Sequence, residues 1–127
     1  MMLLGLHSYS FYNHGVAQSW GGFELPWPRQ WDIFDLIDEA EQLGLDGLHV
    51  DDVPFASMEK EYLQKVRSAA EQKNLYLEYN FSLNSGSYDQ EVEHSFEEGI
   101  WIANDLGTDI AKVSIDLKRP RPVAASR

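Results

Sequence analysis

The sequence contains no cysteine. A disulfide framework and a thiolate metal site are therefore excluded, and a metal ion would need histidine and carboxylate ligands. No apolar run approaches the roughly 18 residues that a membrane span requires, and residues 1–4 lack the basic start and long apolar core of a signal peptide. We therefore expect a cytoplasmic protein with no membrane partner.

Basic residues are scarce as well. Ten Lys and Arg residues stand against 21 Asp and Glu residues, which gives a formal net charge of −11. Because binding to a phosphate backbone depends largely on Lys and Arg, we expect no nucleic-acid partner. A small neutral molecule or a cation is an easier partner for such a chain. With 127 residues and 43% hydrophobic side chains, the chain suits one globular domain with a real core.

Apolar residues alternate with polar ones in four short segments, which predict strands over residues 3–11, 47–51, 75–81 and 110–117. Helical spacing between these segments predicts three helices. Strands that alternate with helices favour right-handed crossovers and a parallel sheet, and sequential order would place the four strands side by side.

The three predicted helices have recognisable ends. The first covers residues 31–43, the second starts after Ser57 as N-cap, and the third starts at a capping box of Ser87 and Gln90. Their C-terminal ends are predicted at Gly44, Asn74 and Gly107. We expect their buried stripes to include Leu43 in the first helix, and Val92, Phe96, Gly99, Ile100, Ala103 and Leu106 in the third.

Residues 13–30 form a long connection rich in glycine, proline and aromatic side chains. A connection of this length is usually functional or disordered, and disordered segments rarely carry so many aromatics. We interpret it as a lid or wall over a pocket. The basic tail, residues 118–127, contains two prolines and has no helical period, so no fourth helix is expected.

The predicted strands have only one apolar side. Their other side carries His7, His49, Glu78 and Lys112, among others. Strands with helices on both sides would be apolar throughout, whereas barrel strands present one face to the outer helices and one to the lumen. The sequence therefore predicts an α/β fold, namely half of a (β/α)8 TIM barrel with four parallel strands, three helices and a non-helical C-terminal tail.

Three segments resemble the xylose isomerase-like TIM barrels, a family of sugar phosphate isomerases and epimerases. They are residues 4–11 as first strand, 40–50 as helix end and second strand, and 75–80 as third strand. The resemblance covers most of the chain and implies that residues 1–117 are the N-terminal half of such a barrel. It rests on motifs that position the fold, which members with different chemistry share.

The resemblance implies metal-assisted proton transfer next to a sugar carbonyl, with a carbohydrate as small-molecule partner. The family usually holds its divalent cation (Mn, Mg or Zn) through ligands on later strands, and this chain has roughly half of the about 250 residues of a complete barrel. No family metal ligand can be carried over, and the chain alone is not expected to complete the reaction. Carbohydrate lyases and dehydratases of the same fold are alternatives, whereas the acidic balance disfavours DNA-repair endonucleases.

Three side chains of the lumen side are candidates for catalysis. His7 and His49 could transfer protons or could be hydrogen-bonded fillers of a barrel layer. Glu78 could act as a base or could only pair with Lys112 on the neighbouring strand. A metal site built from His7, His49, Glu78 and Asp116 has weak support, because no closely spaced ligand motif is present. We expect His94 to lie at the surface.

Six further residues are candidates for substrate binding because they fall on the lumen side, at strand ends or in the aromatic connection: Tyr9, Trp20, Trp27, Asp51, Asn80 and Asp116. Carboxylates at strand ends can hold sugar hydroxyls, and aromatic rings can stack on a sugar. Capping by Asp51, or burial of the aromatic rings against the barrel end or a partner chain, is an equally simple use of these residues.

A second hypothesis is a non-catalytic half-barrel. Open edges of a parallel sheet are a liability for a free monomer, so the first and fourth strands could pair across an interface. The partner would be a second copy of the chain or a complementary half-barrel.

Overall fold

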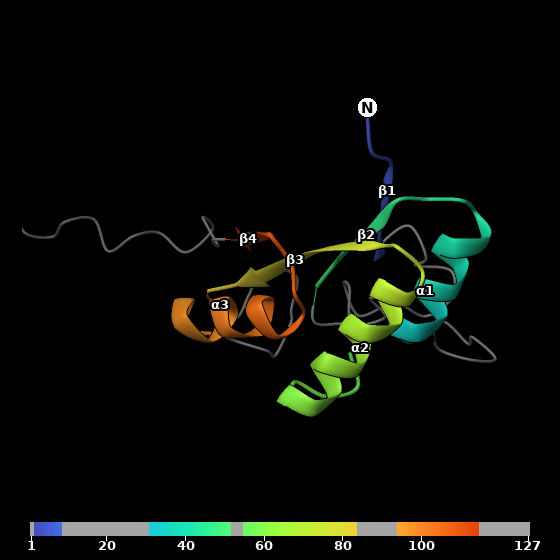
Figure 1. The fold of residues 1–127 in the computed structure, drawn as a ribbon. Helices are drawn as coiled ribbons and strands as arrows, with labels where there is room; N and C mark the ends of the chain where they lie inside the picture. Colours follow the sequence, from blue (N-terminus) through green and yellow to red (C-terminus); the bar gives the residue numbers. More distant parts are fainter. Residues whose placement is uncertain (1, 9–30, 52–54, 84–93, 115–127) are drawn as a thin grey trace, which may run out of the picture.

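The computed structural model describes residues 2–8, 31–51, 55–83 and 94–114. In these residues strands and helices alternate as β1 (Gly5–His7), α1 (Ile33–Gln42), β2 (Gly47–Val50), α2 (Lys60–Gln72), β3 (Tyr76–Ser82), α3 (Phe96–Asp105) and β4 (Ile110–Ser114). The strands are parallel and lie in the order β1-β2-β3-β4, which confirms the predicted α/β arrangement. All three helices lie on one side of the sheet (Figure 1), as half of a barrel requires.

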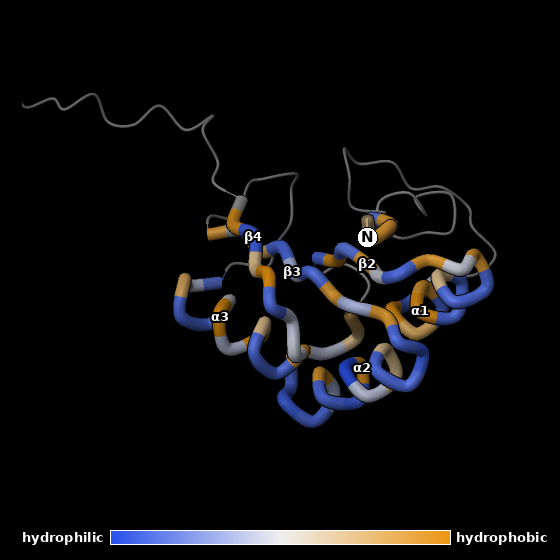
Figure 2. Tube along the Cα trace, turned by 45° about the horizontal axis from the view of Figure 1, so that its top comes forward, coloured by the Kyte–Doolittle hydropathy of each residue, from blue (hydrophilic) through white to orange (hydrophobic). Residues whose placement is uncertain are grey.

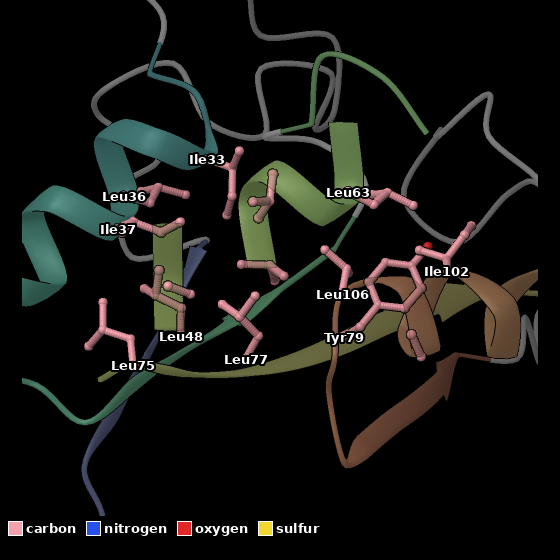
Figure 3. Packing of buried hydrophobic residues seen from close by; sticks show 14 of the residues in the cluster. Ile33, Leu36, Ile37, Leu48, Leu63, Leu75, Leu77, Tyr79, Ile102 and Leu106 are labelled. Atoms are coloured by element: carbon pink, nitrogen blue, oxygen red, sulfur yellow. The ribbon is translucent and has the colours of Figure 1, made fainter. Parts of the chain in front are cut away.

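The hydrophobic core fills the space between the sheet and the helices (Figure 3). Along β2 and β3, alternate side chains point into it, because successive strand residues face opposite sides. Tyr79 and Phe81 extend the predicted apolar side of β3 towards its end, and their rings stack at a centroid distance of 5.8 Å. The core side chains are all at most 7% exposed: Ile33, Leu36, Ile37, Ala40, Leu48, Val50, Leu63, Val66, Ala70, Leu75, Leu77, Tyr79, Phe81, Ile102, Ala103 and Leu106.

The C-terminal ends of the helices match the prediction. Gly44, Asn74 and Gly107 have φ angles of 68°, 54° and 67°, the left-handed conformation that ends a helix. Two residues after Gly44, Asp46 forms hydrogen bonds that connect the starts of three strands. It exchanges two hydrogen bonds with Leu4, backbone N to backbone O at 2.8 Å and Leu4 N to Oδ2 at 2.7 Å, and its carbonyl accepts from Tyr76 N. The helix-turn-strand motif thus sets the register of the sheet.

The predicted starts of two helices are wrong. The N-cap of α2 is Glu59, without a side-chain cap, while Ser57 accepts a hydrogen bond from Glu59 N at 3.0 Å in the preceding turn. The capping box of α3 is formed by Ser95 and Glu98. Both boxes fit the same sequence pattern, and helix α3 begins at the one nearer to the apolar residues that the core contacts.

Several predicted burials are also wrong. Leu43 is the C-cap of α1, so its side chain leaves the helix face. In α3, Gly99 lies against the ring of Phe81 so closely that a Cβ there would be 2.3 Å from Cε2. Phe96, one turn earlier, meets the Phe81 ring edge-on at a centroid distance of 6.2 Å but stays exposed. The core side of α3 includes Ile102 and not Ile100. The large apolar side chains that were expected inside but are exposed are Leu43, Phe96 and Ile100.

His94, expected at the surface, is buried. It precedes α3, and its Nδ1 lies 3.9 Å from Glu98 Oε2 in the first turn of that helix.

The helices are apolar on the side towards the sheet and polar on the outside, as Figure 2 shows. The predicted wall at 13–30, the capping box of Ser87 and Gln90 and the tail at 118–127 lie outside the described residues. Among the helices of the described part, none has the length and apolar character needed to cross a membrane.

Candidate functional site

The three candidate catalytic side chains lie in one row across the sheet. His7 of β1 pairs in register with His49 of β2, and His49 pairs with Glu78 of β3. Their neighbours along the strands, Leu48 and Leu77, face the helices and are buried. By strand alternation the row is on the other side of the sheet, which we call the open face because no described helix covers it. The parallel register therefore assembles residues that are 42 and 29 positions apart in the sequence.

Glu78 is the centre of the contacts on the open face. Its Oε2 lies 2.5 Å from His49 Nε2 and its Oε1 lies 2.9 Å from Lys112 Nζ. The Glu78 side chain is 11% exposed, whereas those of His49 and Lys112 are 28% and 52% exposed. The predicted Glu78–Lys112 pair is thus present, and the same carboxylate also holds a histidine.

The short contact defines which nitrogen of His49 carries a proton. A carboxylate oxygen and an unprotonated ring nitrogen would both be acceptors and would repel each other, so Nε2 donates to Glu78. In the neutral ring Nδ1 is then the basic nitrogen. A carboxylate that orients a histidine and stabilises its protonated form is the arrangement of an acid–base pair.

Tyr76 is a second partner of His49 that the sequence interpretation did not include among the site residues. Its Oη lies 3.2 Å from His49 Nε2, and the two rings are tilted at a centroid distance of 5.9 Å. Tyr76 is in register with Gly47, which is in register with Gly5. Glycine at the start of two neighbouring strands beside a tyrosine on the third was a signal in the sequence that could have identified this residue.

His7 lies in a partly buried part of the row. Burial lowers the pKa of its imidazole, and the nearby charges of His49 and Lys112 lower it further, while Asp51 and Glu78 oppose the shift. Asp51 follows β2 and is only 2% exposed. His7 therefore stays neutral more readily than an ordinary histidine, which suits a hydrogen-bonding or proton-accepting role.

The substrate-binding candidates are only partly within the described residues. Asp51 is buried after the last residue of β2, and Asn80 is half-buried on β3, in register with Lys112. Both belong to the carboxyl-terminal half of the strands, where barrel active sites lie. The other four candidates, Tyr9, Trp20, Trp27 and Asp116, lie outside the described residues.

A cavity of about 360 Å³ in the described part reaches this network. It lies at the starts of β3 and β4, beside α2, and its walls include Tyr76, Glu78, Arg67 and Leu106. This is the amino-terminal end of the sheet, opposite to the end where barrel enzymes bind substrate. We therefore place the candidate site on the open face and not in this cavity.

The described residues do not fit a metal ion. Within residues 2–8, 31–51, 55–83 and 94–114, no group of three histidine, cysteine or acidic side chains has ligand geometry. His49 Nε2 is engaged by Glu78, and Asp116, the fourth member of the predicted set, lies outside the description. No metal ligand is therefore assigned among the described residues.

Comparison of the sequence with protein-family models and with curated proteins finds no match. The resemblance to xylose isomerase-like barrels therefore stays a prediction from the three segments described above. What the structure adds is the parallel order of the strands and the gathering of His7, His49 and Glu78 on one face.

Proposed function

We propose that the open face is the acid–base and hydroxyl-binding half of a sugar or sugar phosphate isomerase or epimerase site. The observation that carries the proposal is the His49–Glu78 contact of 2.5 Å on a face of the sheet that no described helix covers. By resemblance, the metal ligands of such a site lie on later strands than the four described here. A cytoplasmic location is part of the proposal, since a cysteine-free chain needs no oxidising compartment.

The proposed chemistry is proton transfer next to a carbonyl. His49 Nδ1 takes the proton from the carbon beside the carbonyl, and the Glu78 carboxylate stabilises the imidazolium that forms. Lys112, 2.9 Å from Glu78, pairs with that carboxylate and aligns it. In an isomerase His49 then returns the proton to the neighbouring carbon, while a proton passes between the two sugar oxygens. In an epimerase the proton must reach the same carbon from its opposite face, which requires a second acid.

Asp51 and Asn80 supply the polar groups that orient a sugar through its hydroxyls. Both follow the acid–base row in the carboxyl-terminal direction of the strands. The divalent cation that the resemblance implies would polarise the carbonyl or alkoxide when bound. No step is derived through it, because the described residues provide no ligand set.

Sugar binding by the chain tests this proposal without requiring turnover. A panel of aldoses, ketoses and their phosphates is titrated into ¹⁵N-labelled protein, and the resonances of His49 and Asn80 are followed by NMR. We expect saturable shifts for at least one sugar, weakened tenfold or more by Glu78→Gln. Glu71→Gln is the matched control, because Glu71 pairs with Arg67 on the exposed side of α2. Absence of saturable shifts across the panel would contradict the proposal.

Assembly of two half-barrels is the second candidate function, and the exposed apolar residues favour it. Within the described residues β1 and β4 each have one neighbouring strand, so each has an open edge. Exposed apolar side chains gather near both edges: Met2, Leu3 and Leu4 beside β1, and Phe96, Ile100, Trp101 and Ile110 on α3 and β4. Pairing of β4 in one copy with β1 in another would bury both groups and close an eight-stranded sheet.

Mass in solution tests the assembly. We expect a dimer by light scattering, and we expect Trp101→Glu, which places a charge among the exposed apolar residues of α3, to shift it towards monomer. Gln64→Glu adds the same charge on the exposed side of α2 and should leave the dimer intact. A wild-type chain that stays monomeric at high concentration would overturn this candidate.

A further inference from the structure

We propose that Tyr76 is a positioning residue. Its side chain extends over Gly47 to Gly5, and its hydroxyl holds the His49 ring with Nε2 towards Glu78. The inference rests on the proposed function, in which His49 Nδ1 is the base. It goes beyond it because it explains how one tautomer of His49 is selected before a substrate binds.

Gly5 and Gly47 leave space for the Tyr76 side chain because neither has a Cβ. A Cβ on Gly5 would lie 2.2 Å from Tyr76 Oη and 2.9 Å from His49 Nε2. A Cβ on Gly47 would lie 2.5 Å from Cγ and Cδ1 of the same ring. Real Cβ atoms do not approach other atoms so closely, so Tyr76 can extend over β2 to β1 only because both positions lack side chains.

The hydroxyl acts on Nε2 as a second acceptor. The one proton on Nε2 points to Glu78 Oε2 at 2.5 Å and also lies within reach of Tyr76 Oη at 3.2 Å, a three-centre hydrogen bond that requires the Nε2–H tautomer. The phenol is neutral, so it adds no charge beside Glu78. Burial raises the pKa of Tyr76, and the carboxylates of Glu78 and Asp46 raise it further, so the phenol stays protonated over the working range.

The position of Tyr76 separates its role from that of Lys112. Lys112 Nζ contacts Oε1 of Glu78, the oxygen that does not face His49, so it acts on the carboxylate. Tyr76 and Glu78 both approach the same nitrogen, at 3.2 Å and 2.5 Å, and together they leave Nδ1 as the nitrogen that faces a reacting proton. A tyrosine that only filled the start of the sheet would need its ring and not its hydroxyl.

The test is the tautomer of His49, read from long-range ¹H–¹⁵N NMR correlations of the full chain without sugar. We expect the wild-type ring to be the Nε2–H tautomer at neutral pH. Tyr76→Phe keeps the ring and should lower the ratio of Nε2–H to Nδ1–H by about fivefold, as for the loss of one hydrogen bond.

Tyr62→Phe is the matched control. Tyr62 Oη accepts a hydrogen bond from Ala56 N at 3.2 Å on α2, far from His49, so its removal should leave the ratio unchanged. A ratio in Tyr76→Phe equal to that of the wild type, or an equal fall in Tyr62→Phe, would overturn the positioning role. Because no sugar is present, this result is independent of the binding experiment, which tests the proposed function itself.

Discussion

The two faces of the sheet are built from the same strands but by different rules. On the helix side, Leu48 and Tyr79 are fully buried in a core shared by all three helices. On the open face, His49 and Glu78 make a few directional contacts through named atoms. The apolar face depends on shape and volume, which many residue sets can satisfy, whereas the polar face depends on three or four atoms in register.

This difference separates stability from chemistry along the same strand. A substitution on the helix side should change the free energy of unfolding, and one on the open face should mainly change the charge and proton positions of its neighbours. Positions 48 and 49 are adjacent on β2 and point to opposite faces. Substitutions there test the separation most sharply.

The largest effect is expected for Leu48→Ala. Leu48 is fully buried, so the truncation leaves a cavity and should cost about 2–5 kcal/mol of unfolding free energy, measured by urea denaturation. His49→Ala should cost clearly less, because the His49 side chain is partly exposed and leaves little cavity. An equal or greater loss for His49→Ala would break the distinction between the two faces.

Glu78→Gln should have the next largest effect on stability. The amide keeps the shape but loses the charge that holds His49 Nε2 and Lys112 Nζ, at an expected cost of about 1–2 kcal/mol. Glu71→Gln, the control on the exposed side of α2, should leave the urea midpoint unchanged. A neutral result at position 78 would show that the charged pair contributes nothing to the fold.

Ser95→Ala tests the capping assignment that supports the helical face. Ser95 Oγ accepts from Glu98 N at 3.1 Å, and removal of such a cap costs about 1 kcal/mol. Ser57→Ala should cost less, since Ser57 lies in the turn before α2 and caps no helix. The same urea titrations measure both variants, and a larger loss for Ser57→Ala would contradict the observed helix starts.

The smallest effect is a pH dependence that arises from His7. Its folded-state pKa lies below the ordinary value of 6.5, so the unfolded chain binds a proton first as the pH falls. The stability contributed by neutral His7 is complete above pH 6.5 and is lost as the pH falls through the folded-state pKa. Urea midpoints at pH 7.5 and 5.5 should differ less in His7→Asn than in the wild type. An unchanged difference would assign the pH dependence to other groups.

Patterns of the sequence predicted the strands, their order and the C-terminal ends of the helices, because these depend on periodicity and on residues such as Gly44 and Asn74 that favour left-handed backbone. They also placed His7, His49 and Glu78 on one face, since the period of a strand is two. They did not predict the rotation of α3, which brings Ile102 to the core in place of Ile100. The role of Tyr76 was missed because it follows from the register of three strands and not from any one of them.

Exchange of a carbon-bound proton with solvent tests the central claim most directly, because it needs a base beside the bound carbonyl but no complete turnover. The protein is incubated in D₂O with a sugar that binds, with and without Mn²⁺ or Mg²⁺, and the ¹H signal of the carbon next to the carbonyl is followed. We predict loss of that signal in the wild type and retention in Glu78→Gln. Loss of the signal with the wild type no faster than in buffer alone would contradict an acid–base site on the open face.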